Sequence, residues 1–279
     1  MKLYDKIQES IGYIREFTDF MPQYGIVLGT GLGNLTDDLL IACEIDYKDI
    51  PHFPISTVQS HKGKLLFGYL EGLPVVVMAG RFHYYEGYTM QQVTFPIRVL
   101  KFLGIKTILI TNVSGSTNAN MEAGDIVLVH DHINLQTENP LRGENDERLG
   151  VRFPDMKNTY DKTLIDKALH IARQNDIRIH TGVYFSWQGP NLETPAEYRF
   201  INIIGADLVG MSTVPEVIVA KHSDLRIMAI SIVSNKCFPI EEIKETTVED
   251  VIAIAKTAEP KMRLIIKELL KLKEGEDLG

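Results

Sequence analysis

Two stretches in the second half of the chain combine polar side chains with signals for the start of a helix. The run from Asp207 to Ala220 reads DLVGMSTVPEVIVA, in which a short apolar segment stops at Ser212. Thr213 and Glu216 have the spacing of a capping box, which predicts a helix that begins directly after the apolar segment. The N–H groups of a helix start, beside the Ser212 hydroxyl, can bind an anion.

The segment before it has the same pattern of a helix start beside a polar side chain. It reads GPNLETPAE, in which Thr194 and Glu197 form a second capping box and Glu193 stays just outside the helix. A carboxylate in that position can accept hydrogen bonds from a ligand. The alternative interpretation is two well-capped helices and one solvated glutamate, and these stretches alone leave both interpretations open.

A glycine-rich turn follows an apolar segment near the N-terminus. Residues 24–28 are predicted to form a buried strand that leads into GTGLGNL, where backbone N–H groups and the Thr30 hydroxyl can contact an anion. A dinucleotide-binding fingerprint needs its third glycine three residues after the second, whereas Gly33 follows Gly31 by two. The segment is therefore either an anion-binding turn or an ordinary tight turn.

A dense group of ligand-binding side chains follows the predicted strand over residues 75–78. The segment GRFHYYEGY supplies the guanidinium of Arg81, the imidazole of His83, several phenols and a carboxylate. Guanidinium and imidazole groups at a strand end suit an oxyanion. His83 alone could be a satisfied surface histidine, but the density of these groups favours a binding site. His61, at the tip of the polar loop over residues 51–63, could add another donor.

Predicted strands and helices alternate along the chain without a linker, a repeat or a low-complexity tract. Helices are predicted over residues 3–18, 91–103, 161–174 and 249–272. Strands are predicted over residues 24–28, 65–70, 75–78, 107–111, 125–129, 181–186 and 225–233. The strand over 107–111 is expected to end in a turn of small residues at 112–116. This alternation predicts one α/β domain over residues 1–279, with a mixed or mostly parallel sheet covered by helices on both faces.

Ligands of such sheets collect at the carboxyl ends of the strands. The candidate side chains lie at or near these predicted ends: Thr30, His61, Arg81, His83, Asn112, Ser212 and Asn235. Their convergence is a stronger indication of a binding site than any one motif.

The composition excludes several classes of function. A net charge of -8 argues against a nucleic-acid surface, which would need clustered lysine and arginine. Cys43 and Cys237 are too few for a disulfide framework or a four-thiolate zinc site, and no HExxH or paired CxxC spacing occurs. We therefore expect neither a metal nor a cofactor. No apolar run approaches the ~18 residues that span a bilayer and the N-terminus has no apolar signal core, so we expect no membrane partner and a cytoplasmic location.

The motifs resemble those of the homotrimeric purine nucleoside phosphorylases nearly from end to end. The matching segments include GTGLGNL, GRFHYYEGY, DHINL, NPLRGENDER, RFPDM, GPNLETPAE, GMSTVPEVIVAKH and SNK. The resemblance implies a homotrimeric pentosyltransferase of purine salvage whose mixed sheet is distorted toward a barrel. The implied reaction cleaves the N-glycosidic bond of (deoxy)ribonucleosides of 6-oxopurines such as inosine and guanosine. Inorganic phosphate is the co-substrate, and the products are free base and (deoxy)ribose 1-phosphate.

The resemblance also implies roles for individual residues. Catalytic roles fall to Asn235, which donates to the leaving purine, to Glu193, which accepts from its N1–H, and to His83. Phosphate would be bound by Thr30, His61, Arg81, His83, the Val113 backbone and Ser212. The nucleoside would be held by Tyr85, Leu192, Glu193, Met211, Asn235 and Val248, together with Phe153 from the neighbouring subunit.

One position departs from the family pattern. Members that act on ordinary nucleosides usually carry a histidine near the start of the last helix, which contacts the ribose 5′-hydroxyl, and Val248 stands there in this chain. An apolar residue favours a 5′-deoxy or 5′-methylthio group, whereas Asn235 favours 6-oxopurines because the methylthioadenosine branch has an aspartate there. Thr246 or Thr247 could supply a hydroxyl instead. A 5′-methylthionucleoside phosphorylase and, from another class, a non-catalytic nucleotide-binding sensor are the alternatives.

Overall fold

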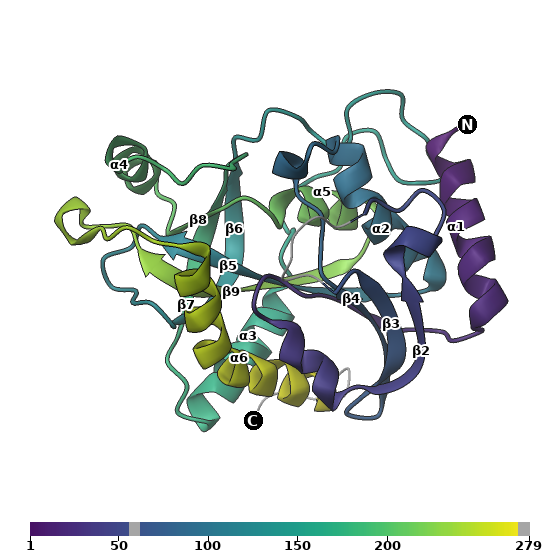
Figure 1. Cartoon of the computed structure of the whole chain (residues 1–279), viewed down its shortest axis with the longest axis horizontal. Helices are drawn as coiled ribbons and strands as arrows, with labels where there is room; N and C mark the ends of the chain where they lie inside the picture. Colours follow the sequence, from purple (N-terminus) through teal and green to yellow (C-terminus); the bar gives the residue numbers. More distant parts are fainter. Residues whose placement is uncertain (56–61, 273–279) are drawn as a thin grey trace.

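The computed structural model describes residues 1–55 and 62–272 (Figure 1). Its strands are β1 Tyr24–Val27, β2 Leu40–Asp46, β3 Lys64–Leu70, β4 Leu73–Ala79, β5 Thr107–Ser116, β6 Ile126–Asn134, β7 Ile179–Ser186, β8 Leu208–Gly210 and β9 Arg226–Lys236. Within the described residues these strands form one sheet in the order β2-β3-β4-β1-β5-β8-β7-β6-β9. Most central strands are runs of Val, Ile and Leu, as expected for strands that are buried on both faces.

The sheet closes on itself through β5. One edge of β5 pairs with β1 along its first residues and with β8 at Gly115 and Ser116, while the other edge pairs with β9 along its length. The pairings β8–β7, β7–β6 and β6–β9 complete a ring of strands. Parallel pairs such as β1–β5 and β5–β9 occur together with antiparallel pairs such as β3–β4 and β6–β9. The prediction of a mixed sheet distorted toward a barrel is confirmed.

Two groups of helices cover the strands. The helices are α1 Leu3–Phe17, α2 Met90–Leu103, α3 Lys162–Gln174, α4 Pro195–Ile203, α5 Val214–His222 and α6 Val248–Lys271. Helix α2 packs against both α1 and α5, and α3 packs against α6, so that the two groups lie on either side of the strands in Figure 1. Helix α4 stands at the periphery, beyond the end of β8. The predicted helices are confirmed to within a few residues.

Three strands run further than the sequence predicts, and one of them is β6, which continues to Asn134. Residues 112–116 were expected to form a turn, but β5 continues to Ser116, and β9 continues through Asn235 to Lys236 beside it. The register pairs Asn112 with Ser231 and Ser116 with Lys236, with an irregularity between Ser114 and Gly115. The expected turn is wrong because each strand supplies the other with backbone hydrogen-bond partners, and this pairing overrides the local preference of small residues for turns.

Candidate active site

A cavity of about 440 Å³ gathers most of the residues that the sequence analysis selected. The selected residues in its lining are Thr30, Arg81, His83, Tyr85, Asn112, Val113, Leu192, Glu193, Met211, Ser212, Asn235 and Val248. Two selected residues are not placed there: Phe153 is 85% exposed on the loop between β6 and α3, and His61 lies outside the described residues. The remaining candidates, although distant in sequence, therefore surround one space.

The turn from β8 into α5 presents Ser212 to this cavity. Thr213 precedes α5 with φ 70° and ψ -59°, and Val214 N–H donates to the Ser212 carbonyl at 2.7 Å, which closes a γ-turn. A positive φ at a β-branched residue is strained and costs on the order of 1–3 kcal/mol. The predicted helix start is confirmed, since the Glu216 carboxylate accepts the Thr213 N–H at 3.1 Å.

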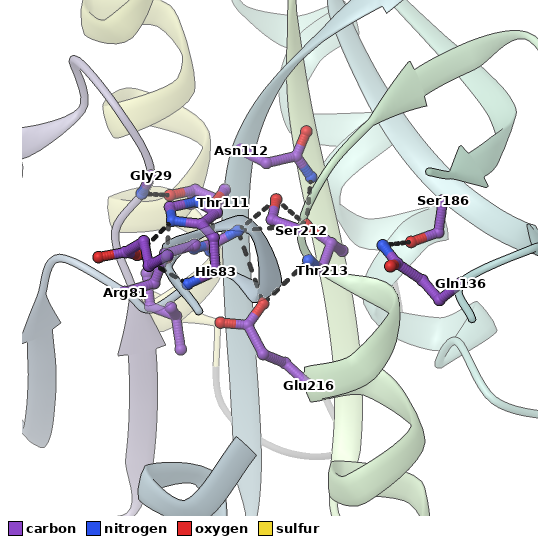
Figure 2. A network of polar contacts seen from close by, with 12 residues as sticks. Gly29, Arg81, His83, Thr111, Asn112, Gln136, Ser186, Ser212, Thr213 and Glu216 are labelled. Atoms are coloured by element: carbon purple, nitrogen blue, oxygen red, sulfur yellow. Dashed lines mark hydrogen bonds and ion pairs between the residues drawn. The ribbon is translucent and has the colours of Figure 1, made fainter. Parts of the chain in front are cut away.

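Thr213 is held in this conformation by long-range hydrogen bonds, which also connect it to Ser212. The Thr213 hydroxyl oxygen accepts from Arg81 Nη1 at 3.2 Å and from Asn112 Nδ2 at 3.0 Å. The Thr213 and Ser212 hydroxyls lie 3.1 Å apart, and both also interact with the Tyr184 hydroxyl. Ser212 Oγ accepts from Arg81 Nη1 at 2.9 Å. Figure 2 shows this network around Arg81.

The Arg81 guanidinium is fixed from several sides. Its side chain is 1% exposed, and Nη2 donates to the Thr111 carbonyl at 2.6 Å. Nη1 lies 3.6 Å from Glu216 Oε2, in an ion pair that is buried at both ends. A guanidinium that is already oriented, next to a hydroxyl and a helix start, forms a preorganised oxyanion site.

His83 and Tyr85 form a second wall of the cavity. His83 is 7% exposed, and its Nδ1 lies 3.0 Å from Glu86 Oε1, which also accepts the His83 backbone N–H at 2.8 Å. Because a carboxylate only accepts, the proton of this pair belongs to Nδ1, and the ring orientation is fixed. The Tyr85 ring stacks on the imidazole with 4.7 Å between centroids.

The glycine-rich turn reaches the cavity because its backbone lies directly against β5. A Cβ at Gly29 would come within 2.9 Å of Asn112 Cα and of the Thr111 carbonyl oxygen. Gly29 N–H donates to the Thr111 hydroxyl at 3.1 Å, and Gly31 has φ 75°. Only glycine fits such an approach, and the result places Thr30 in the same cavity as Arg81.

The other end of the cavity carries a carboxylate and an amide. Glu193 is half-buried just before α4, and burial raises its pKa above the ordinary value of 4.5. Asn235 is held at both ends of its amide: Ser234 Oγ donates to Oδ1 at 2.7 Å, and Nδ2 donates to Cys237 Sγ at 3.1 Å. The second hydrogen of Nδ2 is left for a ligand.

The start of α6 closes the cavity beside the glycine-rich turn. Thr247 caps this helix by accepting the Asp250 N–H at 3.2 Å. Val248 in the first turn is 66% exposed and lines the cavity together with Thr246 and Val251. A ligand group at this end therefore meets two apolar side chains and one hydroxyl.

Several residues of this site were not selected as site residues. Thr213, Glu216 and Glu86 were noted only as a helix cap or as part of a motif, Cys237 was considered only as a disulfide or zinc ligand, and Tyr198 was not considered. The capping spacing could have located Thr213 and Glu216. The positive φ of Thr213 and its partners distant in the chain leave no signal in the local sequence.

No helix in residues 1–55 and 62–272 is long and apolar enough to cross a membrane.

Comparison with known proteins places this arrangement in context. Residues 23–271 match the model of the phosphorylase superfamily. The chain is 48% identical over 248 residues to purine nucleoside phosphorylase 1 of Geobacillus stearothermophilus, covering 86% of this chain and 90% of that protein. It is 43% identical over 274 residues to purine nucleoside phosphorylase of Mus musculus, covering 96% and 95%.

A solved structure gives the same result for the fold. The crystal structure of isoform 2 of purine nucleoside phosphorylase from Schistosoma mansoni, in complex with cytosine and ribose-1-phosphate, superposes with a TM-score of 0.92. It is 39% identical in sequence and covers 97% of each chain.

Proposed function

The chain belongs to the purine nucleoside phosphorylases of the phosphorylase superfamily, and on this premise we propose that it cleaves 6-oxopurine nucleosides, such as inosine and guanosine, with inorganic phosphate as co-substrate. One observation carries the proposal: Glu193 and Asn235 line the same cavity as Thr30, Arg81 and Ser212. An anion site and a purine site then face each other across a space of about 440 Å³.

The anion-binding end of the cavity binds the nucleophile, inorganic phosphate. Cleavage of an N-glycosidic bond passes through a ribosyl group with oxocarbenium character, which an adjacent anion stabilises. A phosphate held by Arg81, Ser212, Thr30 and His83 lies below C1′, where one of its oxygens forms the new bond. The C1′–N9 bond breaks, and its electron pair leaves with the purine.

The base-binding end of the cavity stabilises the leaving group, the purine. The departing purine carries negative charge, which the N–H of Asn235 stabilises at the N7 and O6 edge. The Glu193 carboxylate accepts from N1–H and, in guanine, from the 2-amino group. Adenine has no N1–H, so a carboxylate at this position favours 6-oxopurines.

A nucleoside panel tests the proposal. Release of free base is measured from inosine, guanosine and adenosine, each with and without inorganic phosphate. We expect fast release from the 6-oxopurine nucleosides only when phosphate is present, with ribose 1-phosphate formed in equal amount. Base release that does not depend on phosphate, or binding without release, would contradict the proposal.

The exposed Val248 favours a second candidate, a phosphorylase of 5′-methylthionucleosides. We expect Val248→His to raise kcat/KM for inosine relative to 5′-methylthioinosine by about 10-fold or more, because an imidazole gives the 5′-hydroxyl a hydrogen-bond partner and crowds a methylthio group. Steady-state kinetics with both nucleosides measure this ratio. Thr246→Val is the control for a hydroxyl contact: loss of inosine turnover in this variant would show that Thr246 already binds the 5′-hydroxyl.

We further propose a homotrimer in which Phe153 of one subunit contacts the nucleoside site of the next. The resemblance of RFPDM to the trimeric family supports this, as does the 85% exposure of the Phe153 ring outside its own cavity. The expected effect of Phe153→Ala is a rise of about 10-fold in KM for inosine, with unchanged mass in analytical ultracentrifugation. Phe17→Ala, which removes a ring that is 56% exposed on α1, is the control and should leave KM unchanged. Equal kinetics for both variants would argue against the shared site.

A further inference from the structure

A tyrosine and a cysteine lie directly behind the two groups that face the purine. Tyr198, on α4, is 4% exposed and lines the cavity. Cys237, directly after β9, is fully buried. Neither side chain takes part in the phosphate end of the site, so their contacts with the base end need a separate account.

Tyr198 reaches Glu193 because of the way in which α4 begins. Thr194 is the N-cap of α4, so Glu193 occupies the position before the cap and Tyr198 the fourth position of the helix. Two apolar residues at these positions often pack together and fix the angle at which the chain enters the helix. Here the same positions bring together a carboxylate and a phenol, both of which line the cavity, and the phenol hydroxyl lowers the pKa of Glu193.

The tyrosine hydroxyl also joins the amide side of the site. Tyr198 packs in the same buried cluster as Cys237, and Cys237 Sγ accepts from Asn235 Nδ2 at 3.1 Å. The phenol hydrogen has two acceptors beside it, the Glu193 carboxylate and the Cys237 sulfur, while the thiol donates to the Asn235 backbone carbonyl at 3.8 Å. Burial raises the pKa of Cys237 to about 12, so the thiol keeps its proton at neutral pH. Tyr198 therefore contacts both Glu193 and the residue that holds the Asn235 amide.

We propose that Tyr198 and Cys237 are positioning residues that hold the Glu193 carboxylate and the Asn235 amide at the spacing required by a 6-oxopurine. The inference rests on the proposed function, since it concerns the same base-binding pair. Its basis is the geometry: Tyr198 and Cys237 pack in one buried cluster, Tyr198 lies beside Glu193 at the start of α4, and Cys237 accepts from the Asn235 amide at 3.1 Å.

The hydrogen bond from Tyr198 also keeps Glu193 in its accepting form. The titratable groups that act on Glu193 among the described residues are Tyr198 and Glu197 on α4, and Cys237 after β9. Burial raises the pKa of Glu193, the Glu197 charge raises it further, and the Tyr198 hydrogen bond lowers it. Glu193 must be ionised to accept N1–H, so removal of the phenol hydroxyl moves its protonation to higher pH.

The test measures kcat/KM for inosine against pH in Tyr198→Phe, which keeps the ring and removes the hydroxyl. We expect the acid limb of the profile to move up by about one pH unit, with an unchanged KM for phosphate. A purely structural role would lower activity equally at all pH values. Tyr69→Phe, which removes an exposed hydroxyl on β3, is the matched control and should reproduce the wild-type profile.

Two variants of Cys237 test its contact with Asn235. They also test the proposal independently if Tyr198→Phe does not fold. Cys237→Ala should lower kcat for inosine about 5-fold, because Asn235 loses an anchor, while Cys237→Ser should restore most of it. A Tyr198→Phe profile that superposes on the wild type, or equal kinetics in the two Cys237 variants, would overturn the inference. If the wild type itself shows no phosphate-dependent release of base, it is the proposed function that fails.

Discussion

Replacement of Asn235 by alanine is expected to lower kcat for inosine phosphorolysis by about 10²–10³. Ser234 and Cys237 hold the amide in one orientation, so its remaining N–H is in place before the purine begins to leave. A preorganised donor of this kind stabilises charge that develops only in the transition state, and loss of one such donor typically has an effect of this size. The effect should therefore appear in kcat more than in KM.

Single-turnover measurements of base release, with saturating phosphate, test this expectation. Asn235→Asp serves as the matched variant, because a carboxylate of the same size repels O6 but can accept from the 6-amino group of adenine. We expect it to lose inosine turnover and to gain relative activity on adenosine. Turnover of inosine near the wild-type rate in Asn235→Ala would mean that another group stabilises the leaving purine.

The local signals in the sequence located the anchors of this site. The glycines that follow an apolar strand, and the capping boxes at Thr194 and Thr213, depend on residues within a few positions of one another, so these patterns can be recognised without the fold. The structure places α4 and α5 where these boxes predict them. Strand ends gather ligands in α/β sheets, which is why the candidates from separate motifs converge on one cavity.

The sequence pattern could not predict features that depend on partners distant in the chain. The positive φ of Thr213 is maintained by Arg81 and Asn112, which lie more than a hundred residues away in the chain. Nothing in the local sequence favours this conformation at a threonine. The spacing of Glu193 and Tyr198 could have been recognised as the two ends of a helix staple, whereas the contact with Cys237 requires knowledge of where β9 lies.

The extent of the strands was missed for a related reason. Residues 112–116 and 234–236 contain Gly, Ser and Asn, which favour turns when considered alone, but their mutual pairing extends β5 and β9. Strand β2 was not predicted at all, since most of its residues are exposed and it lies at the edge of the described sheet, paired with β3. Long-range pairing, rather than propensity, determines both outcomes.

Replacement of Arg81 by methionine is expected to raise KM for phosphate by about 10–100-fold and to destabilise the protein by about 3–5 kcal/mol. The first effect follows from loss of a charged donor to the anion. The second follows because Glu216, 3.6 Å from the guanidinium and 3% exposed, is left as a buried charge without its partner. Phosphate kinetics and urea unfolding measure the two effects separately.

A double variant distinguishes these two roles. Arg81→Met combined with Glu216→Gln removes both charges, while the glutamine oxygen can still accept the Thr213 N–H that caps α5. Because a buried ion pair can be replaced as a whole with little loss, we expect the double variant to regain most of the stability that the single variant loses. Its KM for phosphate should stay high, since the cation is still missing. A double variant as unstable as Arg81→Met would show that the ion pair is not the source of the loss, and recovery of phosphate affinity would show that Arg81 is not the group that binds the anion.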